Sequence, residues 1–382
     1  MVAMKIKDCC TVIAGQSPES KYYNTGGMGI PFFQGKADFG ELYPTVRVYC
    51  SQPTKIAEKD DILLSVRAPV GATNLAPGRV CIGRGLTAIR PSPSLDLKYL
   101  LHYFRYFETH LQTKGTGTTF KAITQDIVKN ISVPVPPLPE QRRIVARIEE
   151  LFSELDNGVE TLKKTKQQLA VYRQSVLKAA FERFAQGEVG TIQSVCNNIV
   201  DCPHSTPRWV EHGKLCLRTT NFRRGYLDLT DKNYVSEAAF KTRNIRLVPE
   251  PGDVLYSREG AILGIACIIP EDTFVCLGQR MMLFRTNEKM LGRFLMHYLN
   301  SPFVTTFVNT KIGGSASPHV NVRDIKAFKV PVPTIKVQQT VIDRIESQLS
   351  VSDSIEKSVN AALQQAESMR QSVLKKAFEG GL

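Results

Sequence analysis

The chain carries one segment of its own sequence twice. Residues 133–182 begin VPVPPLPEQRRIVARIEELF and end RQSVLKAAFE. They return without a gap at residues 330–379, and 21 of the 50 positions are identical. Each copy follows a longer and more divergent stretch of similar length. A chain built from two equivalent halves has pseudo-two-fold character, which suits a target that itself consists of two halves.

Each repeated segment predicts an extended piece followed by a long helix. Proline at every second position of VPVP cannot donate to a β-ladder and disfavours helix before it, so this stretch is expected to be an extended edge piece. After Pro139 apolar residues recur at heptad spacing. The two seams are Ile148, Leu155, Leu162, Leu169 and Val176, and Ile144, Leu151, Tyr172 and Ala179. We therefore expect helices over about 140–184 and 337–379.

These two helices are expected to pair with each other in antiparallel fashion. The second copy has apolar residues in equivalent places, namely Val341, Ile345, Ile355, Val359, Ala362, Met369 and Val373. The seam is imperfect, because Gly158 costs about 1 kcal/mol against Ala in a helix and because Gln348 and Ser352 dilute the second stripe. The alternative is that both helices belong to the core of a larger bundle.

The divergent halves are loosely related to each other. DILLS at 61–65 matches DVLYS at 253–257, VCIG at 80–83 matches VCLG at 275–278, and YLLHY at 99–103 matches FLMHY at 294–298. Short β-rich runs, turn residues and one helix near 96–112 or 289–307 indicate a small α+β fold in each half. The expected organisation is a domain at 1–135, a helix at 136–187, a second domain at 188–332 and a second helix at 333–382.

Charge distribution points to a polyanion as the partner. The net charge is +13, and the positive excess lies in residues 1–132 and 188–329 rather than in the repeated segments. Solubility is the alternative explanation of such an excess. No apolar run reaches 18 residues, so no membrane span is expected. The N-terminus lacks a signal-peptide core and the nine cysteines are an odd number, so we expect a cytoplasmic protein with mostly reduced thiols.

Taken together, these motifs resemble the specificity subunit of type I restriction–modification systems. The resemblance covers the whole chain and rests on the repeated PxPxxxxQ…RIExxxS…RQSVLKxAFE segments that follow two divergent halves. It implies that each half is a target recognition domain for one half of a bipartite, asymmetric DNA sequence. It also implies that the helices set the gap between the half-sites. The second copy departs from the first where Lys336-Val337-Gln338 replaces Pro139-Glu140-Gln141, which weakens helix capping.

Polar loops in each half are the candidates for contact with DNA. Arginine suits guanine O6 and N7, and asparagine or glutamine suits adenine N6 and N7, whereas hydroxyls and backbone amides also suit phosphates. For any single residue a solvated surface position is the alternative. The candidates are Gln34, Lys36, Thr116, Thr118, Thr119 and Lys121 in the first half, and Arg208, Arg218, Thr220, Asn221, Arg223, Arg224, Ser315, Ser317, His319 and Asn321 in the second.

The resemblance also implies protein partners and their cofactors. Two adenine methyltransferase subunits would bind the helices and would use S-adenosylmethionine. Restriction subunits that use ATP and Mg would join that complex, and this chain itself would hold no cofactor. The expected partner-binding residues are Arg173, Gln174, Leu177, Phe181, Arg370, Gln371, Leu374 and Phe378.

Other motifs carry little chemistry. Residues 83–88 match GxGxxA, but Ile89-Arg90-Pro91-Ser92-Pro93 follows, so we expect a strand and a turn rather than a dinucleotide loop. The sequence contains no GxxxxGK[ST] and no [DN]PP[YFW], which argues against an ATPase and a methyltransferase. Cys196, Cys202, His204 and Cys216 lack a CxxC knuckle, so we expect no metal site. The alternatives are an enzyme, either a restriction nuclease or a methyltransferase, and an architectural coiled-coil DNA-binding protein.

Overall fold

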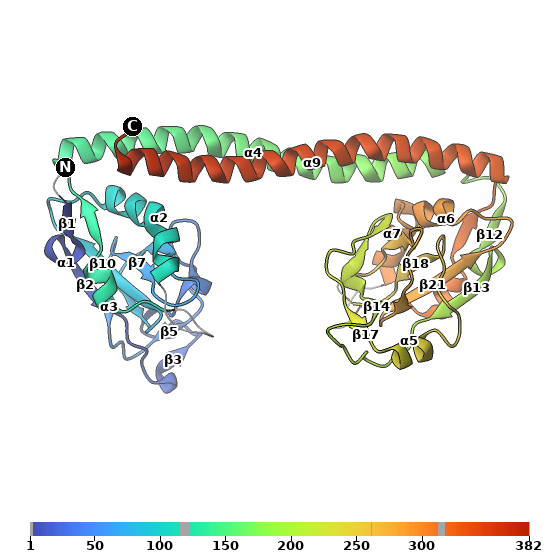
Figure 1. Cartoon of the computed structure of the whole chain (residues 1–382), viewed down its shortest axis with the longest axis horizontal. Coiled ribbons are helices and arrows are strands. Elements are labelled where there is room, and N and C mark those ends of the chain that lie inside the picture. The colour runs from blue at the N-terminus through green and yellow to red at the C-terminus, as the bar shows by residue number, and fades with distance from the viewer. Residues whose placement is uncertain (1–2, 115–121, 261, 312–317, 382) are drawn as a thin grey trace. The chain divides into compact units, whose positions relative to one another are not determined.

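The computed structural model describes residues 3–114, 122–260, 262–311 and 318–381 (Figure 1). They form two compact units. The first unit combines residues 1–162 with residues 361–382, and the second comprises residues 163–360. Each unit contains one domain of mixed helix and sheet together with part of each of two long helices, so the expected α+β class is confirmed. The long helices are α4 (Leu138–Glu182) and α9 (Ile335–Glu379).

The first domain is built around two small sheets. Its elements are β1 (Ala3–Lys5), α1 (Ile6–Cys9), β2 (Cys10–Ala14), β3 (Tyr23–Asn24), β4 (Ile30–Phe33), β5 (Tyr49–Cys50), β6 (Ile56–Ala57), β7 (Ile62–Ser65), β8 (Thr73–Leu75), β9 (Val80–Ile82), β10 (Leu86–Pro91), α2 (Leu97–Lys114), α3 (Gln125–Lys129) and β11 (Ser132–Pro134). One sheet is antiparallel in the order β2-β10-β7-β8. The other has the order β3-β5-β4-β9-β6, and in it β4 and β9 are parallel.

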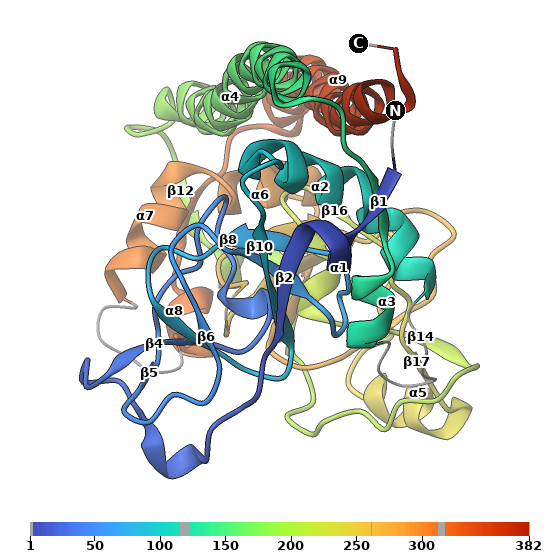
Figure 2. The same cartoon turned by 90° about the vertical axis from the view of Figure 1, so that its left-hand side faces the viewer.

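Strand β7 shows why this sheet is buried on both faces. Its side chains alternate, as in any strand. Ile62 and Leu64 join the core beneath the helices, whereas Leu63 joins the core shared with the second sheet. Helix α2 covers the first of these faces, and Figures 1 and 2 both show it between strands β2 and β10 and the long-helix segments of this unit. A nearly continuous apolar run is what such a doubly covered strand requires.

The second domain repeats this plan. Its elements are β12 (Val189–Thr191), β13 (Cys196–Asp201), β14 (Lys214–Leu217), β15 (Phe222–Arg223), β16 (Tyr226–Leu227), β17 (Tyr234–Val235), α5 (Glu237–Arg243), β18 (Val254–Ser257), β19 (Ala266–Ile268), β20 (Cys276–Leu277), β21 (Met281–Thr286), α6 (Gly292–Leu299), α7 (Pro302–Lys311), α8 (Val322–Lys326) and β22 (Lys329–Pro331). The sheet β13-β21-β18-β19 corresponds to β2-β10-β7-β8, and the parallel pair β14-β20 corresponds to β4-β9.

Two sequence predictions about local structure are confirmed. The first two residues of each VPVP stretch belong to a short strand, and each strand pairs with the first strand of its own domain, β11 with β1 and β22 with β12. The GxGxxA match is a turn followed by strand β10, which pairs with β2 and β7. The glycines therefore belong to a strand connection, and no helix follows them.

The long helices run in opposite directions within each unit. In the first unit Asp156 of α4 forms an ion pair with Arg370 of α9. In the second unit Arg173 of α4 forms ion pairs with Asp353 at 2.5 Å and with Glu356 at 2.6 Å. The helices span 138–182 and 335–379, close to the predicted 140–184 and 337–379. Heptad repetition of apolar residues is the physical reason for these helix lengths. The predicted seams are not buried throughout, because Tyr172, Ile355 and Met369 are 43%, 42% and 47% exposed.

A buried glutamine anchors each long helix to its domain. The Gln141 side chain accepts a hydrogen bond from Asp96 N at 2.7 Å and donates to Ser94 O at 3.0 Å and Pro136 O at 2.7 Å. Its counterpart, Gln338, accepts from Leu291 N at 2.8 Å and donates to Lys289 O at 2.7 Å and Pro333 O at 2.8 Å. Both side chains are fully buried. Glutamine fits because its amide offers an acceptor and two donors at once.

A phenylalanine near the end of each long helix packs on the opposite domain's covering helix. Phe378 of α9 contacts Tyr99 and Tyr103 of α2 at ring-centroid distances of 5.2 and 5.3 Å. Phe181 of α4 contacts Phe294 and Tyr298 at 5.2 and 5.1 Å. These edge-to-face contacts place the AFE ends of the two repeats in equivalent surroundings. Each domain core is thus completed by a segment that is distant in sequence.

The equivalent histidines His102 and His297 differ in their surroundings. His297 Nε2 lies 3.3 Å from Glu346 Oε1. His102 is 5% exposed, and its Nδ1 has no hydrogen-bond partner among the described residues. The corresponding carboxylate, Glu149, instead forms an ion pair with Lys98 at 2.7 Å. Burial, with a further contribution from Arg105, lowers the pKa of His102 to about 4.

Candidate nucleic-acid interface

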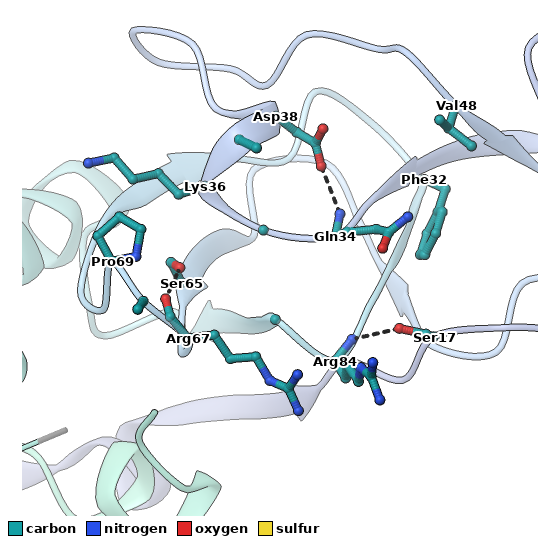
Figure 3. Close-up of a pocket in the computed structure, with 14 residues that line it drawn as sticks. Ser17, Phe32, Gln34, Lys36, Asp38, Val48, Ser65, Arg67, Pro69 and Arg84 are labelled. Carbon is teal, nitrogen blue, oxygen red and sulfur yellow. Dashed lines mark hydrogen bonds between the residues drawn. The ribbon is translucent and has the colours of Figure 1, made fainter. Parts of the chain in front are cut away.

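The first domain contains an open cleft of about 800 Å³ (Figure 3). Its walls come from three turns: the one after β4, the β7–β8 connection and the β9–β10 turn. Parallel pairing of β4 with β9 brings the first and third of these turns to the same edge. The lining residues are Ser17, Phe32, Gln34, Gly35, Lys36, Ala37, Asp38, Val48, Ser65, Arg67, Ala68, Pro69, Arg84 and Gly85.

Two sequence-predicted residues, Gln34 and Lys36, lie in this cleft. Gln34 is the first residue after β4, and its backbone N donates to Asp38 Oδ2 at 2.8 Å. This bond closes a tight turn through a 3-10 helix at Lys36–Asp38. The Gln34 and Lys36 side chains are both exposed. The turn therefore presents an amide and an ammonium group while Asp38 is engaged by the backbone.

Sequence reasoning missed Arg67 and Arg84, which line the same cleft. Figure 3 shows their side chains extending in the same direction. The backbone under each is held by a serine, because Ser65 Oγ donates to Arg67 O at 3.0 Å and Arg84 N donates to Ser17 Oγ at 3.3 Å. Their signal in the sequence was their place close behind the matched motifs, Arg67 two residues after DILLS and Arg84 directly after VCIG.

The cleft is therefore basic. Within the described part of the chain, Lys36, Arg67 and Arg84 form no ion pair, so their charges face solvent. Three cations without an ion pair among the described residues surround an open concave surface that Asp38 also lines, and their excess creates a local positive potential that attracts polyanions. Guanidinium groups can contact a phosphate or the O6/N7 edge of guanine. The exposed side chain of Gln34 adds an amide that can contact a base edge, so the surface suits nucleic acid.

In the second domain Arg218 occupies the place of Gln34. It follows β14 as Gln34 follows β4, and its backbone N donates to Asn221 Oδ1 at 2.9 Å. The Arg218 guanidinium lies over the Trp209 ring at 5.7 Å, in cation–π geometry. Arg208 and Thr220 are exposed near the same segment in sequence. Arg218 therefore remains a candidate for base contact.

Asn221 is a structural residue of this loop. Its side-chain amide donates to Asp228 O at 3.0 Å and to Asp231 O at 2.9 Å, in addition to accepting from Arg218 N. The residue is 4% exposed. With its hydrogen bonds directed into the loop, Asn221 holds Arg218 in place and presents no amide to a base edge.

The side chains of the neighbouring arginines, Arg223 and Arg224, already interact with other groups of the protein. Arg223 forms an ion pair with Asp228 at 2.8 Å and donates to Thr220 O at 2.8 Å. Arg224 donates to Asn300 O at 3.5 Å. Both precede Gly225 in the β15–β16 connection, where a φ of 101° is a left-handed conformation that glycine adopts without strain.

The late loops are only partly described. Thr116, Thr118, Thr119, Lys121, Ser315 and Ser317 lie outside the described residues. His319 forms an isolated antiparallel bridge with Glu259, as Ala122 does with Arg67. Asn321 is exposed and precedes helix α8. The structure thus brings His319 to the second-domain counterpart of the cleft wall.

The expected partner-binding residues divide into buried and exposed groups. Leu177, Phe181 and Leu374 are at most 4% exposed and pack in the chain's own cores, and Phe378 is half-buried against α2. Arg173 and Arg370 form the ion pairs between α4 and α9 described above, and Gln174 donates to Asn300 O at 3.5 Å. Gln371 is exposed. Burial by the domain could not be foreseen from the helix sequence alone.

No metal site or membrane span emerges within the described ranges. The His, Cys, Asp and Glu side chains there form no group of three or more suited to a metal ion. All nine cysteines are free thiols, and burial raises the pKa of Cys196 to about 12. No described helix is both long enough and apolar enough to cross a membrane.

Comparisons with known proteins identify the family. A putative type I restriction enzyme MjaX specificity subunit of Methanocaldococcus jannaschii is 40% identical over 167 residues, which are 44% of this chain and 38% of that protein. The type I restriction enzyme EcoBI specificity subunit of Escherichia coli is 25% identical over 315 residues, 75% of this chain and 65% of the relative. The matches thus span less than two thirds of either relative's length.

A solved structure has the same fold. It comes from work on complex assembly and conformational transition of a type I R-M system, and the likeness covers 100% of this chain and 98% of that one. The TM-score is 0.71 at 18% sequence identity. The family described as type I restriction modification DNA specificity domain matches residues 1–170 and 219–365. The chain therefore belongs to the family of type I restriction modification DNA specificity domains.

Proposed function

We propose that this chain is the non-catalytic DNA-recognition subunit of a type I restriction–modification complex. Residues 1–135 and 188–332 would each read one half of a bipartite, asymmetric target. The basic cleft of the first domain, where Lys36, Arg67 and Arg84 are exposed and form no ion pair among the described residues, is the observation that carries this proposal. Family membership and the repetition of the fold support the two-half target.

The helices would set the distance between the two half-sites. Rigid helices that separate two independent readers make spacer length a function of helix length. Adding or deleting whole turns in both α4 and α9 should change the spacer and leave both half-site sequences intact. Sequencing of adenine methylation in cells that also express a methyltransferase partner measures this. Altered half-site bases with an unchanged spacer would exclude the ruler.

The partners of the complex would be two methyltransferase subunits and restriction subunits, acting in the cytoplasm. S-adenosylmethionine would belong to the former, and ATP with Mg to the latter. Since Leu177, Phe181 and Leu374 are buried, exposed neighbours must supply the docking contacts. Tyr172 and Met369 occupy equivalent repeat positions and are 43% and 47% exposed. An exposed apolar residue in both copies suits two equivalent partner subunits.

Binding measurements over a salt series test the cleft. Lys36→Ala and Arg84→Ala should each weaken DNA binding and reduce the salt slope by about one unit if the residue contacts a phosphate. Arg79→Ala is the matched control, because Arg79 is an exposed arginine of the same domain that does not line the cleft. If all three variants bind like the wild type in the presence of the methyltransferase partner, the cleft is not the DNA site.

The second domain is tested by its arginine loop. Arg218→Ala should lose about 1–3 kcal/mol on the cognate site and relax one base position. Arg223→Ala and Arg224→Ala should instead weaken binding to all duplexes alike. The Arg223–Asp228 ion pair makes the Arg223 effect the smaller of these two. Equal discrimination by all three variants would remove this loop from the interface.

Exchange of one domain separates this function from a purely architectural one. Replacing residues 188–329 with those of a relative should change one half of the methylated target only. An architectural DNA-binding protein would show no half-site to change. Methylation by the purified chain alone, with S-adenosylmethionine and DNA, would show instead that the chain is an enzyme.

A further inference from the structure

Arg67 and Glu259 occupy the same position in the two domains. Each lies two residues after its matched serine, Ser65 or Ser257, and each forms the isolated bridge to the late loop of its domain. Two hydrogen bonds repeat at equivalent places: Val66 N to Gly85 O at 3.0 Å, and Arg258 N to Arg280 O at 3.0 Å. The same backbone site thus carries a cation in one domain and a carboxylate in the other.

The Glu259 carboxylate lies near two arginines but outside hydrogen-bond distance of both. It lies 4.0 Å from Arg258 Nη1 and 3.9 Å from Arg280 Nε, which are beyond ordinary hydrogen-bond length. Arg258 is committed elsewhere, because it donates to both oxygens of Asp201 at 2.8 and 3.2 Å. Glu259 is 31% exposed and can reach a ligand.

If this wall faces DNA, as in the proposed function, a carboxylate there can contact only some of the groups that DNA presents. It repels phosphates, so it contributes nothing to non-specific attraction. In the major groove glutamate accepts from the N4 amino group of cytosine, whereas arginine donates to O6 and N7 of guanine. Opposite charges at one equivalent position would therefore select complementary bases.

We propose that Arg67 and Glu259 are specificity-determining residues that make the two half-sites chemically different, with Arg67 reading a guanine and Glu259 reading a cytosine. This inference rests on the proposed function. Arg67 has Arg84 beside it in the cleft, which makes the first domain rich in donors. In the second domain the position of Arg84 belongs to Gln279, which is already hydrogen-bonded to His204 O at 2.8 Å. Glu259 therefore offers a carboxylate acceptor at the position where the first domain has a guanidinium donor.

Three variants of the full chain, assayed with the methyltransferase partner, test the inference. Glu259→Gln keeps the size of the side chain and removes its charge, Glu259→Arg copies the first domain, and Glu271→Gln is the control, an exposed glutamate of the same domain. Binding to a library of duplexes and sequencing of methylated sites are the measurements. Trp209 fluorescence verifies that the second domain of each variant is folded.

The expected result is a change at a single base position. Glu259→Gln should lower discrimination for cytosine there about 5- to 150-fold, the range for one good base contact. Glu259→Arg should shift the preference to guanine and leave the other half-site unchanged. Unaltered base preferences with a uniform rise in affinity for all duplexes would overturn the inference. Absence of any sequence preference in the wild type would instead overturn the proposed function itself.

Discussion

Replacing the buried glutamine Gln338 with alanine should destabilise the second unit by about 3 kcal/mol. The side chain makes three hydrogen bonds with distances of 2.7–2.8 Å and is fully buried. A hydrogen bond contributes about 1 kcal/mol net, and a buried group left without a partner costs about 1–3 kcal/mol. Alanine leaves Leu291 N, Lys289 O and Pro333 O without these bonds, so the loss is at least the sum of three ordinary hydrogen bonds.

The protein supplies both the probe and the control for this measurement. Trp209 is the single tryptophan of the chain and lies in the second unit, so its fluorescence in a urea titration reports unfolding there. With a slope of about 2–3 kcal/mol/M, a loss of 3 kcal/mol lowers the midpoint by about 1–1.5 M. Gln339→Ala is the matched control, because Gln339 is exposed and bonds only Asp343 on its own helix at 2.8 Å among the described residues. Equal midpoints for the two variants would refute the anchoring role.

Three further predictions concern other parts of the chain. In the wild type, His102 should lower the free energy of unfolding by roughly 3 kcal/mol as pH falls from about 6.5 to 4, because its pKa is depressed in the folded state and the unfolded state therefore binds the proton first. His102→Phe should abolish this decrease, and urea unfolding followed by circular dichroism measures it. Gly85→Ala would place a Cβ 2.2 Å from Gln34 O, so it should disrupt the cleft and DNA binding, whereas Gly78→Ala, with nothing within 4 Å, should not. Arg173→Ala breaks two partly exposed ion pairs and should lower the free energy of unfolding of the second unit by only about 1 kcal/mol, measured by Trp209 fluorescence. A decrease above about 3 kcal/mol would contradict this.

The fold was largely predictable because its determinants are local or repeated. Heptad spacing predicts both long helices to within two residues at each end, and proline alternation predicts the edge strands before them. The repeat also predicts two related domains. Internal repetition supplies independent support for each assignment, because a short motif such as DILLS is informative only when a similar motif, DVLYS, recurs in the same order in the second half.

The site was less predictable because it depends on contacts between distant turns. Gln34 and Arg84 lie at one edge because β4 pairs in parallel with β9, and Arg67 joins them because β7 pairs with β10. Nothing in the three separate turns indicates these pairings. Asn221 shows a second reason why the site was less predictable. A polar residue in a basic loop suggested base contact, yet its amide is consumed by backbone groups seven and ten residues later. Hydrogen-bond satisfaction of this kind is decided by loop closure, which residue type alone does not determine.

The first domain's dependence on the end of α9 has a consequence for protein synthesis. Tyr106 and its partner Glu379 are 273 residues apart, and Phe378 closes the same core. At about 5–20 residues per second a ribosome needs roughly 14 to 55 s to cover that interval. Throughout that time the apolar face of α2 can pack against α4 but lacks its contacts with the end of α9. The second unit needs no residue beyond 360, so it can assemble earlier although it is encoded later. Nascent chains should therefore depend on chaperone protection of the N-terminal half, and damage near residue 378 should appear as misfolding of the opposite end of the sequence.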